Sequence, residues 1–234
     1  MAKAPRPWIV TRHEPIEKLE DNLWVVEGDV PGAPFRRRMS IVRRSDGTLL
    51  FFNAIPLEES ALREVTSWGK PTVLVVPHDA HMIDAHAFAE KLGLALYGPK
   101  ECEAKVRARA PMAGTYDALP GDAALRLEPV AGVKNGEPAL FVTSSGGRVS
   151  LLVSDVLMNN RSDAIGFLPR LMGFSGSAKI VPVFRMMFLK DKAALRAQLE
   201  RWAQVPGLVH LVPCHGDVLS TGVAEALRGA ATTL

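Results

Sequence analysis

The stretch Thr72-Val-Leu-Val-Val-Pro-His78-Asp79-Ala-His81-Met-Ile-Asp84-Ala-His86 carries the strongest indication of the fold. Its first five residues are apolar or β-branched and predict a buried strand. Pro77 ends that strand because proline has no N–H to donate to a sheet. The three histidines and two aspartates that follow can bind borderline metals and transfer protons near neutral pH. Because α/β proteins keep such groups where buried strands end, the stretch predicts an α/β protein with a site at this point.

The composition is that of a globular protein with little charge bias. The 234 residues are 47% hydrophobic and 23% charged, and their formal net charge is +3. This charge is too small to predict nucleic-acid binding, so we expect no nucleic-acid partner. The basic run Arg36-Arg37-Arg38 is interpreted as a solvated face rather than a site for an anionic partner. No apolar run reaches the roughly 20 residues of a membrane span, so we expect no membrane partner either.

The length and the N-terminus predict a single cytoplasmic domain. A chain of 234 residues commonly forms one domain, and we expect it to cover residues 1–234. The first seven residues are basic and lack the apolar segment of a secretory signal, so a cytoplasmic location is expected.

The two cysteines argue against a disulfide framework. Cys102 and Cys214 are the only cysteines of the sequence, and reduced thiols are typical of cytosolic proteins. Cys214 precedes His215, and such a pair could act as a nucleophile and its base without a metal. A metal-free hydrolase that uses Cys214 and His215 is a weak hypothesis, because neighbouring residues of a strand point to opposite faces.

The order of the predicted elements indicates an α/β layer arrangement. Antiparallel strands come first, and Asp46-Gly47 is a strong hairpin signal because glycine tolerates the positive φ of a tight turn. Strands then alternate with helices, and the second half of the chain again combines strands with helices. We expect strands at 8–10, 22–28, 39–44, 48–53, 72–76, 94–97, 124–130, 139–143, 148–154 and 208–213, and helices at 57–68, 85–92, 100–109, 192–202 and 218–230.

Three of the predicted strands end in residues that can bind a metal. His78 follows the strand at 72–76, and Asp155 and His215 follow two later strands in the same way. If the carboxyl ends of these strands lie together, the site collects the four side chains His78, His81, Asp155 and His215. Histidine nitrogens and carboxylate oxygens form a suitable ligand set for one zinc ion. Water bound to such an ion is a nucleophile near neutral pH.

This arrangement resembles the metallo-β-lactamase fold superfamily, and the resemblance covers nearly the whole chain. The early hairpin, the strand followed by histidines, the turn Gly136-Glu-Pro, the pair Ser154-Asp155 and the late Pro213-Cys-His215-Gly216 occur in the family's order. The resemblance implies a fold of class α/β (α+β in some schemes), a four-layer αββα sandwich with one or two zinc or iron ions at an edge of its sheets. Most members of the superfamily hydrolyse lactams, thioesters, lactones or phosphodiesters.

The sequence departs from the family pattern at two of its metal motifs. The family's His-x-His-x-Asp-His is replaced by His78-Asp-Ala-His81-Met-Ile-Asp84, in which the spacing is changed. The family's Gly-His-Thr-Pro-Gly is replaced by Gly132-Val-Lys134-Asn-Gly136, so Lys134 stands near a lost histidine and its ammonium could neutralise nearby carboxylates. Only Asp155 and His215 match their family positions. A single ion is therefore expected rather than a binuclear zinc centre.

Two functional hypotheses follow from the resemblance. The first is a metal-dependent hydrolase that uses one ion, zinc ahead of iron or manganese, to cleave a small-molecule ester, lactone, thioester or phosphoester. Activated water would attack the substrate, and Asp84 or His86 would assist proton transfer. The alternative is a non-catalytic protein of the same fold that has lost its metal and binds a ligand or partner. The changed spacing and Lys134 favour this alternative, whereas the retained histidines and Asp155 favour the hydrolase.

Several of these candidates also have a purely structural interpretation. His78 and His81 could belong to a capped loop with ordinary hydrogen bonds. Asp84 could be the N-cap of the helix at 85–92, where a short acidic side chain accepts a backbone hydrogen bond. His86, on that helix, could be structural as well.

Overall fold

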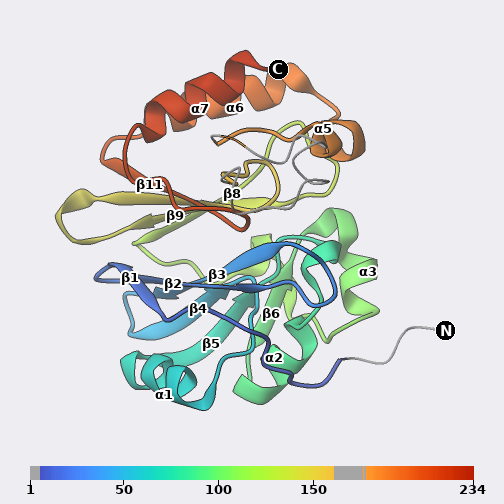
Figure 1. Cartoon of the computed structure of the whole chain (residues 1–234), viewed down its shortest axis with the longest axis vertical. Helices are drawn as coiled ribbons and strands as arrows, with labels where there is room; N and C mark the ends of the chain where they lie inside the picture. The colour runs from blue at the N-terminus through green and yellow to red at the C-terminus, as the bar shows by residue number, and fades with distance from the viewer. Residues whose placement is uncertain (1–5, 161–175, 177) are drawn as a thin grey trace. The chain divides into compact units, whose positions relative to one another are not determined.

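The chain folds as two units, each built on one β-sheet, in a computed structural model that describes residues 6–160, 176 and 178–234. Unit 1 is Met1–Ala33 with Arg37–Leu125, and unit 2 is Pro34–Arg36 with Arg126–Leu234. In Figure 1, unit 1 runs from blue to green, and unit 2 runs from yellow to red apart from its short blue segment at residues 34–36. The single domain expected over residues 1–234 stays a prediction.

Unit 1 contains a seven-stranded sheet whose strands lie side by side in the order of the sequence. They are β1 (Glu17–Glu20), β2 (Leu23–Asp29), β3 (Arg36–Arg43), β4 (Thr48–Phe52), β5 (Lys70–Val75), β6 (Ala95–Gly98) and β7 (Gly114–Thr115). β1 pairs with β2, and β3 with β4, in antiparallel fashion, while β4 to β7 pair in parallel. The change to parallel pairing comes where helices begin to connect the strands, because a parallel pair needs a long crossover.

The helices of unit 1 pack on its sheet through alternate strand residues. They are α1 (Glu59–Trp68), α2 (Ala85–Leu92) and α3 (Glu103–Arg107), with 3₁₀ turns at Asp79–His81, Lys100–Cys102 and Tyr116–Ala118. Leu49 and Phe51 of β4 point to the helices, since successive side chains of a strand alternate between its faces. Phe88 of α2 meets Phe51 edge to face, with 5.1 Å between the ring centroids. Gly93 ends α2 in the left-handed conformation, where the sequence predicted the stop.

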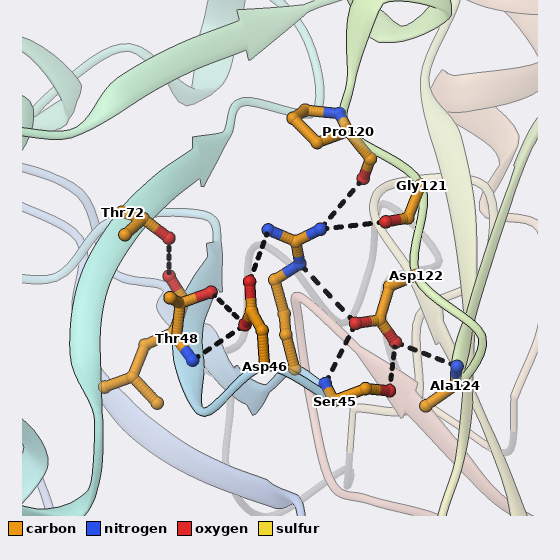
Figure 2. A network of polar contacts seen from close by, with 10 residues as sticks. Ser45, Asp46, Thr48, Thr72, Pro120, Gly121, Asp122 and Ala124 are labelled. Atoms are coloured by element: carbon orange, nitrogen blue, oxygen red, sulfur yellow. Dashed lines mark hydrogen bonds and ion pairs between the residues drawn. The ribbon is translucent and has the colours of Figure 1, made fainter.

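The turn of the β3–β4 hairpin is anchored to the segment at the end of unit 1. Gly47 has a φ of +80°, as the predicted turn requires. Figure 2 shows the polar network around this turn, in which the guanidinium of Arg44 donates to the carbonyl oxygen of Gly121 at 3.0 Å. The carboxylate of Asp122 accepts from the backbone N–H of Ser45 at 2.9 Å and from its hydroxyl at 3.0 Å. These bonds fix the chain where it leaves unit 1.

Unit 2 contains a four-stranded sheet in the order β11-β10-β9-β8. Its elements are β8 (Leu125–Pro129), β9 (Pro138–Thr143), β10 (Val149–Val153) and β11 (Leu208–Pro213), the helices α5 (Pro182–Phe188), α6 (Lys192–Trp202) and α7 (Val223–Thr232), and a 3₁₀ turn at Ser145–Gly147. β9 and β10 are antiparallel, whereas β10 and β11 are parallel. Trp202 of α6 packs on Phe141 of β9, with ring centroids 6.0 Å apart, in a core that α7 also joins. Each unit thus supplies one sheet layer and one helix layer.

Three of the predicted elements differ clearly from the structure. The helix predicted at 100–109 is a 3₁₀ turn at Lys100–Cys102 followed by α3 at Glu103–Arg107. Residues 8–10 form no strand; instead the ring of Trp8 stacks on Phe88 with centroids 5.5 Å apart, so side-chain packing holds this segment. The last helix begins at Val223 rather than at residue 218. The cause is an isolated antiparallel bridge between Leu211 and Leu219, whose backbone hydrogen bonds of 2.9 Å keep the chain extended past the strand.

The two cysteines are free thiols, as expected from their number. Cys102 and Cys214 are both buried. Burial raises the pKa of the Cys102 thiol to about 11, so it stays protonated and unreactive at neutral pH.

The expected cytoplasmic location stays a prediction. In the described part of the chain, no helix is both long enough and apolar enough to cross a membrane.

Candidate metal site

Asp155 and His215 lie together in unit 2, just beyond two neighbouring parallel strands. Val153 at the end of β10 pairs with Pro213 at the end of β11, so the residues two positions further along come opposite each other. Nε2 of His215 lies 3.3 Å from Oδ1 of Asp155. The structure therefore brings together two of the four predicted metal ligands within one sheet.

The second ring nitrogen of His215 restricts what this contact can be. Nδ1 lies 2.6 Å from the backbone carbonyl oxygen of Arg36. Because a carbonyl only accepts, Nδ1 carries a hydrogen, and the neutral ring presents its lone pair at Nε2. Nε2 and the Asp155 carboxylate are then both electron-pair donors, so their contact requires a proton or a cation. A metal-bound histidine commonly donates its other N–H to a carbonyl in this way, and the pair fits a metal ion.

His78 and His81 lie together in unit 1, in the 3₁₀ turn that follows β5. Both side chains are buried, and their rings meet edge to face with centroids 4.7 Å apart. Nδ1 of His78 accepts from the backbone N–H of Ala80 at 3.3 Å and so caps the turn. With Nδ1 as acceptor, the neutral ring carries its hydrogen on Nε2, so ligation through Nε2 requires the other tautomer. The capped-loop interpretation of His78 therefore has direct support, and its metal role stays a prediction.

The two predicted proton-transfer residues have charged partners within unit 1. Asp84 is at the N-cap position of α2, as predicted, but its side chain makes no capping hydrogen bond. Its buried carboxylate instead pairs with the buried guanidinium of Arg37 and lies 3.4 Å from Nη1 of Arg6. Nε2 of His86 lies 3.8 Å from Oε2 of Glu90, one turn further along α2. Catalytic roles for Asp84 and His86 stay predictions.

Several solved metallo-β-lactamases have this arrangement of elements. DIM-1 metallo-β-lactamase superposes with a TM-score of 0.63 at 12% identity, over 95% of this chain and 99% of that one. The metallo-β-lactamase from Pontibacter korlensis also gives 0.63 at 12% identity, over 95% and 100% of the two chains. The metallo-β-lactamase from Erythrobacter litoralis gives 0.59 at 12% identity, over 94% and 92%. The chain has the metallo-β-lactamase fold. No family model and no curated protein matches the sequence.

The metallo-β-lactamase fold predicted from the order of the motifs is thus confirmed, although one detail of the basic residues differs. The run Arg36-Arg37-Arg38 is not a solvated face, because Arg37 is 3% and Arg38 6% exposed. Their strand, β3, lies inside the sheet, and the guanidinium of Arg38 lies 3.7 Å from the carboxylate of Glu27. Tertiary ion pairs therefore hold these arginines, which a count of charges along the sequence does not reveal.

The sequence suggested Lys134 as a charge that neutralises nearby carboxylates. Its side chain is exposed, and it makes no ion pair with any residue that the structure describes. Its backbone N–H donates to the carbonyl oxygen of Phe188 at 3.0 Å. Neutralisation of a carboxylate by this ammonium therefore stays a prediction.

A set of side chains missed by the sequence analysis fixes the turn that carries His78 and His81. The hydroxyl of Tyr116 donates to the carbonyl oxygen of Val76 at 2.6 Å. The guanidinium of Arg109 donates to the carbonyl oxygen of Asp79 at 2.7 Å, and Nζ of Lys105 lies 3.1 Å from the carboxylate of the same residue. These partners come from later elements of unit 1, and no local sequence pattern predicts their contacts with the turn.

A further missed residue, Glu137, holds the backbone at Asp155. Its side chain is fully buried, and its Oε2 accepts from the N–H of Asp155 at 2.8 Å and from that of Val156 at 3.3 Å. In the sequence, Glu137 was recognised only as part of the turn Gly136-Glu-Pro. An acidic residue directly before an apolar strand was the available signal, since glutamate is rarely buried without a specific partner.

The backbone around His215 is tied to the loop that follows Asp155. Asn159 donates its N–H to the carbonyl oxygen of His215 at 3.1 Å and accepts from the N–H of Asp217 at 2.9 Å. Gly216 between them has a φ of +90°, and a Cβ added there would lie 2.3 Å from the backbone of Asn159. The position of His215 therefore depends on a glycine as its neighbour.

Replacing Gly216 by alanine should destabilise this region. The positive φ and the clash with the Asn159 backbone act together, so we expect Gly216→Ala to lower the free energy of unfolding by about 2–4 kcal/mol in urea titrations. Gly146→Ala is the matched control: its φ is also positive, at +73°, but nothing lies within 4 Å of the added Cβ. It should cost only about 1 kcal/mol. Equal losses in the two variants would contradict the close approach at Gly216.

Proposed function

We propose that this protein is a metal-dependent hydrolase that binds one divalent ion, zinc ahead of iron or manganese, through His78, His81, Asp155 and His215. The observation that carries the proposal is the contact between Nε2 of His215 and Oδ1 of Asp155, with Nδ1 of the same ring committed to the Arg36 carbonyl. His78, His81 and Asp155 each offer one nitrogen or oxygen atom of the kind that zinc prefers. The metallo-β-lactamase fold supports the same conclusion by analogy alone.

The chemistry of the proposed reaction is hydrolysis of a small ester, lactone, thioester or phosphoester. A bound divalent ion supplies Lewis acidity, which polarises a carbonyl or phosphoryl group and makes water a stronger acid. Among the residues expected to move protons, the side chain of His86 is 26% exposed, whereas that of Asp84 is 1% exposed and paired with Arg37. His86 is therefore the better placed of the two to exchange a proton with water.

The proposal is tested by metal analysis of protein purified without an affinity tag. After dialysis against zinc and removal of the excess, we expect about one equivalent bound per chain. Turnover of an activated ester, lactone, thioester or phosphodiester should disappear with a chelator and return with zinc. Less than about a tenth of an equivalent in folded protein would contradict the metalloenzyme, because sites with three or four protein ligands bind zinc tightly.

A second candidate function is that of a non-catalytic protein of the same fold that binds a ligand or partner. The contact between Nδ1 of His78 and the N–H of Ala80 favours it, since it commits this ring to capping the turn. This candidate predicts a folded protein that retains no metal in the dialysis experiment and hydrolyses none of the four substrates.

A further inference from the structure

A fully buried carboxylate contacts the backbone of one proposed metal ligand, Asp155, without being a proposed ligand itself. Glu137 is 0% exposed, and its Oε2 accepts from two successive backbone N–H groups, those of Asp155 and Val156. Burial of an ionised carboxylate is costly unless direct hydrogen bonds replace its hydration. Hydrogen bonds to a carboxylate are also stronger than those between neutral groups. Glu137 is thus bound firmly to one point of the backbone.

The backbone that Glu137 binds lies beyond the end of the hydrogen-bonded ladder between β9 and β10. The last register pair between β9 and β10 joins Leu140 and Leu152, and β9 begins at Pro138, which has no N–H. The N–H groups of Asp155 and Val156 lie beyond this ladder and still need acceptors. Oε2 of Glu137 accepts from both N–H groups. A side-chain oxygen thus serves as the hydrogen-bond acceptor that a neighbouring strand would otherwise provide. Because the backbone angles of Asp155 decide where its Cβ points, this contact also directs its carboxylate.

We propose that Glu137 is a positioning residue, which aims the Asp155 carboxylate at Nε2 of His215 and thereby sets the affinity of the metal site. The inference rests on the proposed function, since it concerns the same pair of ligands. In this role Glu137 neither binds the metal nor transfers a proton. Its effect on the metal passes through the backbone of Asp155.

The neighbourhood of Glu137 offers a conservative variant that separates position from charge. Oε1 of Glu137 lies 3.5 Å from Nδ2 of Asn135, whose side chain is buried. In Glu137→Gln the amide oxygen can accept from both backbone N–H groups. The amide nitrogen of the new glutamine can donate to Oδ1 of Asn135 once the side-chain amide of Asn135 flips. Glu137→Gln therefore keeps the contacts and removes the charge, whereas Glu137→Ala removes both.

Zinc affinity of the full-length variants tests the inference. We expect Glu137→Ala to bind zinc about 10- to 100-fold more weakly than wild type and Glu137→Gln to stay within about threefold. Gln198→Ala is the control for a general loss of stability: Gln198 is 3% exposed and bonds the backbone of Ala131 and Pro129 elsewhere in unit 2. Its zinc affinity should match wild type. Unchanged affinity in Glu137→Ala, or an equal loss in Glu137→Gln, would overturn the positioning role.

A metal-free measurement separates this inference from the proposed function. If wild type binds no zinc, the proposed function fails, but amide hydrogen exchange and the ring ¹⁵N shifts of His215 still report on Glu137. In metal-free protein, Glu137→Ala should speed exchange at the amides of Asp155 and Val156 and shift the His215 ring signals, while Gln198→Ala should do neither. Wild-type exchange and ring signals in Glu137→Ala would overturn the inference.

Discussion

Replacing His215 or Asp155 by alanine should weaken zinc binding at least about hundredfold, because an ion held by three or four protein ligands loses much of its binding energy with any one of them. The loss should be largest for His215→Ala. Its Nδ1–H is already oriented by the Arg36 carbonyl, so wild type binds the ion with little reorganisation of the ring. Competition with a chromophoric chelator, on tag-free and metal-free protein, measures both affinities.

A control histidine outside the proposed site makes this result specific. His210 lies on β11, the strand that leads to His215, and its Nδ1 lies 2.8 Å from the hydroxyl of Ser220. His210→Gln should leave zinc affinity unchanged. Wild-type affinity in both His215→Ala and Asp155→Ala would show that these residues are not the ligands.

His78→Ala and His81→Ala then define how far the site extends. If all four predicted ligands hold the ion, these variants should lose zinc affinity as His215→Ala does. Wild-type affinity in both would limit the site to the ligands of unit 2. It would also assign His78 to the capping role that its contact with the N–H of Ala80 already performs.

The fold could be predicted from the sequence because its decisive signals are local. The strand before His78, the hairpin turn at Asp46-Gly47 and the helix that Gly93 stops all depend on residues near one another in the chain. The closeness of Asp155 and His215 could be predicted for the same reason, since each follows an apolar strand and parallel pairing brings such ends together. Their role as metal ligands stays a prediction.

The supporting residues of the site could not be predicted in this way. Glu137 contacts Asp155, and Tyr116 contacts Val76, only because the sheets bring distant segments together. A helix-start pattern placed Asp84 correctly at the N-cap but gave no sign of its partner on β3. Local propensity is weak compared with a buried tertiary ion pair, so the capping hydrogen bond was lost to the arginine.

Removing Asp84 should destabilise unit 1 strongly, because it leaves the guanidinium of Arg37 buried without its carboxylate. The two side chains are 1% and 3% exposed. We expect Asp84→Ala to lower the free energy of unfolding by about 3–5 kcal/mol, the usual cost of breaking a buried ion pair from one side. Arg37→Met should cost less, since Arg6, 3.4 Å away, remains as a partner for the carboxylate. Urea titration of each variant, followed by circular dichroism, measures these losses.

The double variant Arg37→Met/Asp84→Ala decides whether the loss comes from an unpaired buried charge. With both charges gone, no uncompensated ion remains, so the double variant should be more stable than Asp84→Ala alone by about 1–3 kcal/mol. Arg63→Ala is the control for an exposed pair, with both side chains 68% exposed, and should change stability by less than about 1 kcal/mol. Additive losses from the two single changes would contradict the ion pair as the cause. The core around α2 would then owe its stability to packing rather than to the partnership of Asp84 with Arg37.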